Sequence, residues 1–198
     1  MPRLVPARNR FLGSFPGALP PPDLPEVALV GRSNVGKSSA VNTLLNHKTA
    51  RVSRTPGRTQ AIVLFNVDER LILADLPGYG YARVPEPVRQ AWKELVEGYL
   101  RERPSLRLVV LLVDSTIPAQ PMDLELISGM TRAGMPLIVA ATRADKLTKS
   151  ARKPTLRALA AGLGIADDAL LPFSSVTREG VDEMWARIET HTLASARR

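Results

Sequence analysis

The chain has 198 residues, 44% of them hydrophobic, which indicates one globular domain of ordinary size rather than a disordered segment. It has no cysteine, which excludes disulfides, thiolate zinc sites and cysteine nucleophiles and fits a cytoplasmic location. A net charge of +8 predicts attraction to polyanions, and no apolar run approaches the length of a bilayer span, so we expect no membrane partner.

The beginning of the chain is rich in proline. Residues 1–25 hold seven prolines and little periodicity, which predicts an extended arm ahead of a single domain over 26–198. Strand-like and helix-like segments then alternate. Strands are expected at 27–30, 60–67, 70–76, 106–114, 136–142 and 170–173. Helices are expected at 37–46, 86–102, 121–133, 150–162 and 180–194.

This alternation predicts an α/β fold with three layers, in which a mostly parallel six-stranded sheet carries helices on both faces. The segments 60–67 and 70–76 are separated only by the dipeptide DE. Such a short connection suits a hairpin, so we expect one antiparallel strand at the edge of the sheet.

The stretch GRSNVGKSS, which starts at Gly31, lies between the first strand and the first helix. Its glycines and its Lys-Ser pair have the spacing of a phosphate-binding P-loop. Glycines let the backbone approach phosphate oxygens, and the amides at the helix start point at the anion. Lys37 can bridge the outer phosphates and the Ser38 hydroxyl can bind Mg²⁺, so a nucleotide site is predicted here.

The stretch DLPGYG, from Asp75 to Gly80, ends the apolar strand LILA. An acid at the carboxyl end of a strand beside a P-loop can hold Mg²⁺ through water. Gly78 offers a backbone amide near the γ-phosphate and a hinge that can move on hydrolysis. We therefore interpret this segment as a nucleotide-dependent switch.

Two further motifs indicate which base is bound. The stretch TRAD follows the strand PLIVAA, and its Asp145 can accept hydrogen bonds from the ring N–H and exocyclic amine of guanine. Adenine lacks that pair of donors, so Asp145 would be left unpaired by it. The stretch FSS, from Phe173 to Ser175, offers a backbone amide for the guanine oxygen. All four motifs fall at the carboxyl ends of strands, where open α/β sheets bind ligands.

Together, GRSNVGKSS, TPGRTQ, DLPGYGYA, TRAD and FSS resemble the EngB (YsxC/YihA) family of bacterial ribosome-biogenesis GTPases, within the TrmE-Era-EngA-EngB-Septin-like superfamily. The resemblance implies a Ras-like G domain that binds GTP or GDP with Mg²⁺. It implies a role in assembly of the large ribosomal subunit, with rRNA and ribosomal proteins of its precursor as partners, and a link to cell division and septation. We expect a monomer.

The resemblance also implies the site residues. The phosphate loop falls on Gly31, Arg32, Ser33, Asn34, Val35, Gly36, Lys37 and Ser38. The first switch falls on Gly57, Arg58, Thr59, Gln60 and Ala61, and the second on Asp75, Leu76, Pro77 and Gly78. The base site falls on Thr142, Arg143, Ala144, Asp145, Phe173, Ser174 and Ser175. Lys37, Thr59 and Gly78 are the expected catalytic residues, and Ser38 and Thr59 the expected Mg²⁺ ligands.

Three positions bear on the chemistry. The base motif of the family has lysine where this chain has Arg143. We expect the protein still to select guanine, because Asp145 is present, but to bind the nucleotide with a different affinity. Many GTPases place a water-orienting glutamine where this chain has Tyr79, so slow intrinsic hydrolysis is expected, with a partner supplying what is missing. Related GTPases use an asparagine at the position of Asn34 to hold K⁺, which could stand in for an arginine finger. The alternative is that Asn34 only forms the turn before the helix.

Two other functions fit parts of the pattern. A P-loop ATPase or kinase acting on a small substrate would share the phosphate loop, but the motif around Asp145 argues against it. A basic RNA-binding module with a vestigial nucleotide site would fit the net charge of +8. The intact set of Lys37, Ser38, Thr59 and Asp75 argues against that alternative.

Overall fold

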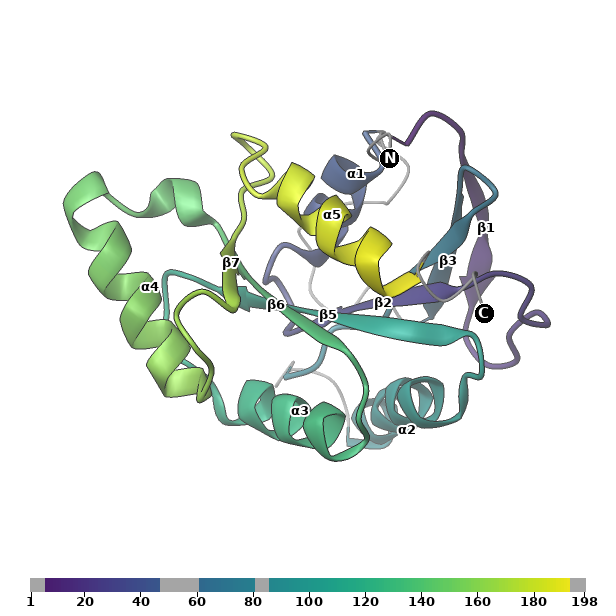
Figure 1. Cartoon of the computed structure of the whole chain (residues 1–198). Coiled ribbons are helices and arrows are strands. Elements are labelled where there is room, and N and C mark those ends of the chain that lie inside the picture. The colour runs from purple at the N-terminus through teal and green to yellow at the C-terminus, as the bar shows by residue number, and fades with distance from the viewer. Residues whose placement is uncertain (1–5, 47–60, 81–85, 193–198) are drawn as a thin grey trace.

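The computed structural model describes residues 6–46, 61–80 and 86–192. A seven-stranded sheet with the order β1-β3-β4-β2-β5-β6-β7 forms the centre of the molecule (Figure 1). Its strands are β1 (Asn9–Phe15), β2 (Glu26–Gly31), β3 (Ile62–Val67), β4 (Leu71–Asp75), β5 (Leu106–Asp114), β6 (Leu137–Thr142) and β7 (Leu170–Pro172). Its helices are α1 (Lys37–Leu44), α2 (Glu86–Glu102), α3 (Pro121–Arg132), α4 (Lys149–Leu163) and α5 (Val181–Thr192), with a short 3₁₀ turn η1 (Ala144–Lys146).

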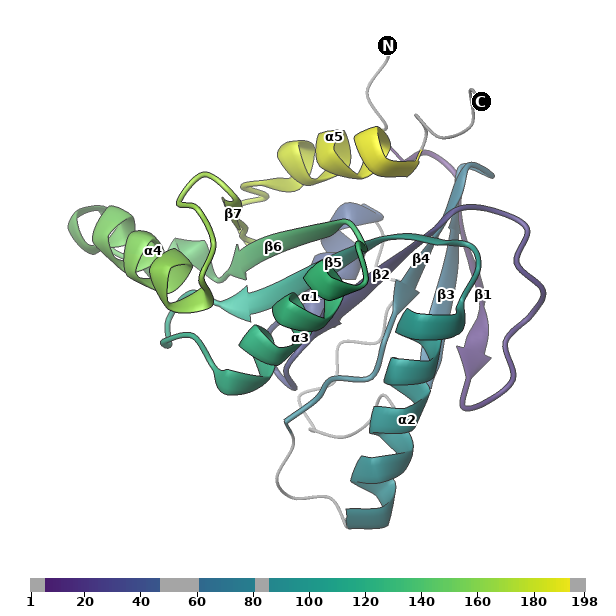
Figure 2. The same cartoon turned by 60° about the horizontal axis from the view of Figure 1, so that its bottom comes forward.

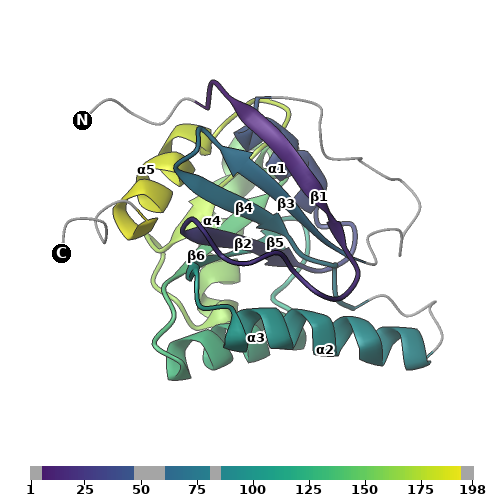
Figure 3. The same ribbon diagram turned by 90° about the vertical axis from the view of Figure 1, so that its right-hand side faces the viewer.

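The predicted α/β architecture is confirmed, with one addition. β3 pairs antiparallel with both of its neighbours, β1 and β4, whereas the other paired strands are parallel. The sheet has seven strands rather than six because β1, from the proline-rich beginning of the chain, occupies the edge expected for β3 (Figure 3). Residues 7–15 contain no proline, so their N–H groups are available for this pairing.

The helices cover both faces of the sheet. α1 and α5 lie on one face, while α2 and α3 lie on the other, as Figures 1 and 2 show. β5 illustrates why, because its side chains alternate between two separate clusters of buried residues. Leu108, Val110 and Leu112 pack in the cluster that contains α1 and α5, whereas Val109 and Leu111 pack in the cluster that contains Tyr99 of α2.

The nucleotide-binding motifs meet where the chain changes sides of the sheet. From the central β2 the chain first passes to β3 and β4 on one side, and then crosses to β5 on the other side. The carboxyl ends of β2 and β5 therefore flank the switch point at which open α/β sheets bind ligands. Within the described ranges, no helix is both long enough and apolar enough to cross a membrane.

Candidate functional site

The phosphate loop begins where β2 ends and depends on two glycines. A Cβ atom on Gly31 would lie 2.6 Å from the carbonyl oxygen of Leu112, so only glycine lets the loop pass this close to β5. Gly36 has φ 99° and caps α1 in the left-handed region, which glycine adopts without strain. Between them, Arg32 forms a bridge to Tyr79, and Ser33 and Asn34 make a turn. The loop connects the end of β2 to the start of α1.

The lysine and serine that follow Gly36 converge on one acid. The Lys37 ammonium lies 2.5 Å from Oδ1 of Asp75, and the Ser38 hydroxyl lies 3.2 Å from Oδ2 of the same carboxylate. Lys37 and Asp75 are both buried, and Asp75 is the last residue of β4, the strand beside β2. The sequence placed these three groups in two separate motifs, and the fold brings them into contact.

The segment after Asp75 runs along the phosphate loop. The Leu76 N–H donates to the carbonyl of Leu29, and the Ser33 N–H donates to the carbonyl of Tyr79 over 2.8 Å. The Tyr79 N–H in turn donates to the carbonyl of Gly31, and the Ser33 hydroxyl lies 3.3 Å from the carbonyl oxygen of Gly78. The expected second switch is thus hydrogen-bonded to the loop that would hold the phosphates.

The Tyr79 side chain points to α3 and contacts an acid that sequence reasoning missed. Its hydroxyl donates to Oδ1 of Asp123 over 2.7 Å, and Asp123 is 3% exposed. Burial, together with this contact, raises the pKa of the Tyr79 hydroxyl. Burial also raises the pKa of the Asp123 carboxyl, although the Tyr79 hydroxyl and Arg32 act in the opposite direction. No local pattern around Asp123 distinguishes it from an ordinary first-turn helix acid.

The base-site residues form a second, connected cluster. The Thr142 hydroxyl donates to the carbonyl of Val35 over 2.7 Å, which ties the end of β6 to the phosphate loop. The Ser174 hydroxyl lies 2.5 Å from Oδ1 of Asp145, which orients that carboxylate. The Ala144 N–H donates to the carbonyl of Phe173, so the two base motifs are held to each other. Ser175 follows, half-buried.

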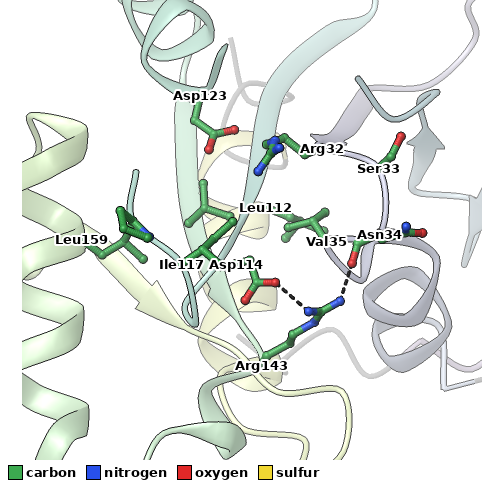
Figure 4. Close-up of a pocket in the computed structure, with 12 residues that line it drawn as sticks. Arg32, Ser33, Asn34, Val35, Leu112, Asp114, Ile117, Asp123, Arg143 and Leu159 are labelled. Atoms are coloured by element: carbon green, nitrogen blue, oxygen red, sulfur yellow. Dashed lines mark hydrogen bonds and ion pairs between the residues drawn. The ribbon is translucent and has the colours of Figure 1, made fainter. Parts of the chain in front are cut away.

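Arg143, the arginine of the TRAD motif, links the base site to the phosphate loop (Figure 4). One end of its guanidinium lies 2.7 Å from Oδ2 of Asp114, and the other donates to the carbonyl of Asn34 over 2.5 Å. The other carboxylate oxygen of Asp114 accepts from the Thr116 N–H and hydroxyl. Asp114 was not predicted, because the chain separates it from Arg143 by 29 positions. The planar fork of arginine suits this double contact.

One predicted group falls largely outside the described residues. Most of the expected first switch lies there, namely Gly57, Arg58, Thr59 and Gln60. Thr59 is the residue expected as the second Mg²⁺ ligand. Ala61 is described and buried, directly before β3. The oxygen donors that are described, the Ser38 hydroxyl and the Asp75 carboxylate, are the hard ligands that Mg²⁺ prefers, and they already share one place at the start of α1.

The chain is similar to known GTP-binding proteins. Residues 26–143 match the family model described as 50S ribosome-binding GTPase. The chain is 46% identical over 178 residues to the "Probable GTP-binding protein EngB" of Geobacter metallireducens, covering 89% of this chain and 87% of that protein. It is 41% identical over 180 residues to the protein of the same name from Aquifex aeolicus, covering 90% and 97%.

Solved structures have the same fold. The crystal structure of a probable GTP-binding protein EngB superposes with a TM-score of 0.70 at 24% identity, covering 83% of this chain and 97% of that one. NFeoB from S. thermophilus, solved with GDP·AlF4⁻ and K⁺, superposes with a TM-score of 0.61 at 25% identity, covering 85% and 62%. The motifs of the phosphate loop, switch and base site therefore stand in a fold shared with nucleotide-binding relatives.

Proposed function

Because the chain belongs to the EngB family of GTP-binding proteins and is a GTPase, we propose that it acts as a nucleotide-dependent switch in assembly of the large ribosomal subunit. The observation that carries this proposal is the match of residues 26–143 to the model of 50S ribosome-binding GTPases. The partners would be rRNA and ribosomal proteins of the precursor, in the cytoplasm. The link to cell division and septation is part of the same proposal.

The surface next to the base site supports a polyanionic partner. Lys146 lies in η1, directly after Asp145, and Lys149 and Lys153 lie in the first turns of α4. All three side chains are exposed, and the whole chain carries a net charge of +8. Such a surface attracts RNA at low ionic strength, and the attraction weakens as salt is added.

The chemistry we propose for the site uses few protein groups. Lys37 leaves Asp75 and neutralises charge on the outer phosphates, while the amides at the start of α1 bind the same oxygens. Ser38, together with Thr59, would hold Mg²⁺, and Asp75 would hold it through water. When bound, Mg²⁺ supplies further charge neutralisation for phosphoryl transfer. The Gly78 amide would contact the γ-phosphate, and Asp145 would select guanine.

Asn34 supports a monovalent cation as a further component. Its φ of 65° is left-handed, its carbonyl accepts from Arg143, and its side-chain amide points away from Arg143 (Figure 4). That amide could therefore bind K⁺ beside the phosphates. We expect faster GTP hydrolysis in K⁺ than in Na⁺ at equal ionic strength. A rate that does not depend on which cation is present would rule this component out.

The switch function is tested by sedimentation with purified 50S subunits in a non-hydrolysable GTP analogue, in GDP and without nucleotide. We expect co-sedimentation with the analogue and loss of it with GDP. The variant Asp145→Asn, loaded with the xanthine counterpart of the analogue, is the specificity control, and its association should follow the xanthine nucleotide. Equal association in all nucleotide states would contradict a switch.

A further inference from the structure

Tyr79 does not occupy the place of a water-orienting side chain. It directly follows Gly78, yet its hydroxyl donates to Asp123 at the start of α3 over 2.7 Å. Its ring packs against the buried cluster on the α2–α3 face of the sheet. The side chain is thus fixed at its ring and at its hydroxyl, and it points into the protein.

The carboxylate that accepts this hydroxyl belongs to a buried residue, Asp123. Asp123 is 3% exposed, so little water reaches its carboxyl, and this burial raises the pKa of the group. Arg32 of the phosphate loop lies on the same side and lines the same pocket (Figure 4). The Tyr79 hydroxyl is the side-chain donor to this buried carboxylate, and a buried acceptor that loses a donor is costly.

The backbone beside this contact is held to the phosphate loop as well. Both backbone polar groups of Tyr79 are bonded to the phosphate loop, through Gly31 and Ser33. Gly78 is held so close to this loop that a Cβ on it would lie 3.1 Å from Cα and N of Ser33. Because Gly78 directly precedes Tyr79, a shift of the Tyr79 backbone would move the Gly78 amide relative to the phosphates.

We propose that Asp123 and Tyr79 are positioning residues for GTP hydrolysis, which hold the Gly78 amide where the γ-phosphate must meet it. The inference rests on the role of Gly78 in the proposed function. In the reaction, a water oxygen bonds to the γ-phosphorus and the bond to the bridging oxygen breaks. The electron pair of that bond stays on GDP, and the water protons leave with inorganic phosphate and solvent. Neither positioning residue exchanges a proton.

The test compares two tyrosines whose hydroxyls both donate to a buried carboxylate, one beside the proposed site and one in another part of the molecule. Tyr79→Phe removes a hydroxyl that donates to Asp123 beside the site. Tyr99→Phe is the matched control, because the Tyr99 hydroxyl donates to the buried carboxylate of Glu26 in another part of the molecule. Single-turnover hydrolysis of bound GTP, equilibrium affinity for GDP and thermal unfolding are measured for both variants and the wild type.

We expect Tyr79→Phe to hydrolyse GTP at least about tenfold more slowly, because small misplacements at a reacting centre are costly. Its affinity for GDP should stay within about twofold of wild type, since the Gly78 amide faces only the γ-phosphate. Tyr99→Phe should lose stability but keep the hydrolysis rate. Asp123→Asn retains an acceptor oxygen and should lose less activity than Asp123→Ala.

Two results would overturn the inference. One is a wild-type hydrolysis rate in Tyr79→Phe, and the other is an equal loss in Tyr79→Phe and Tyr99→Phe, which would show a stability effect only. Gly78→Ala separates this failure from failure of the underlying role. If Gly78→Ala also hydrolyses GTP at the wild-type rate, the Gly78 role itself is wrong. If Gly78→Ala is slow while Tyr79→Phe is not, only the positioning role is wrong.

Discussion

The Lys37 ammonium and the Asp75 carboxylate lie 2.5 Å apart, with their side chains 7% and 4% exposed. The same carboxylate contacts the Ser38 hydroxyl with its other oxygen. The groups expected to hold the nucleotide phosphates and Mg²⁺ are therefore joined to each other across the phosphate site. Nucleotide binding must exchange this ion pair for contacts to phosphate and metal.

The first prediction concerns that exchange. In Asp75→Ala, Lys37 keeps a buried charge without a partner, which costs about 3–5 kcal/mol in the free energy of unfolding of the nucleotide-free protein. Bound GDP supplies phosphate oxygens to Lys37, so the loss should be smaller in the GDP complex. Urea unfolding with and without GDP measures both values.

The control for this prediction is Asp167→Ala, which breaks the exposed ion pair between Asp167 and Arg157. Exposed pairs contribute about 1 kcal/mol or less, so this variant should unfold almost like the wild type with or without GDP. A loss in Asp75→Ala that is the same with and without GDP would contradict the exchange of partners.

The second prediction concerns the arginine in the base motif. Asp114 holds Arg143 against the phosphate loop, and Asp114→Ala frees the guanidinium from one of its two contacts. We expect GDP affinity to fall by about tenfold, which corresponds to about 1.4 kcal/mol. The loss should be smaller when Arg143→Ala is already present, because the two residues act as a pair. Additive losses in the double variant would show that Asp114 does not act through Arg143.

The third prediction concerns the loop that carries Ser174. Gly180 has φ 75°, and a Cβ on it would lie 2.2 Å from the carbonyl oxygen of Pro172. Gly134 has a similar φ of 63° but nothing within 4 Å, so Gly134→Ala is a matched control. The control should lose about 1–2 kcal/mol for its left-handed backbone alone. Gly180→Ala should lose more and should also weaken GDP binding, and equal losses would contradict this.

The fourth prediction concerns pH. Burial raises the pKa of the Asp123 carboxyl above its ordinary value of 3.8, so the folded protein holds this proton more tightly than the unfolded chain does. The group then adds stability at acid pH, and this stability is lost as the pH rises through the folded-state pKa. We therefore compare the free energies of unfolding of the wild type and of Asp123→Asn. The wild-type value minus the variant value should become larger as the pH is lowered from 7 to 4. A constant or decreasing difference would contradict the raised pKa.

The sequence alone predicted the elements whose signals are local. The phosphate loop, the strand ending at Asp75 and the base motifs combine short residue patterns with apolar runs, and the fold places them at one edge of the sheet. β1 was missed because proline dominates its neighbourhood and its pairing partner β3 lies far along the chain. Asp123 lies 44 positions from Tyr79, so only the folded chain reveals their contact.

The most direct test of the account is the base specificity that Asp145 would confer. Fluorescent GDP and GTP are bound to the wild type and to Asp145→Asn, with ATP and xanthine nucleotides as competitors. We predict that ATP does not displace guanine nucleotides from the wild type and that Asp145→Asn shifts toward xanthine, whose C2 carbonyl suits an amide donor. Equal displacement by ATP and GTP from the wild type would contradict the assignment of the guanine site.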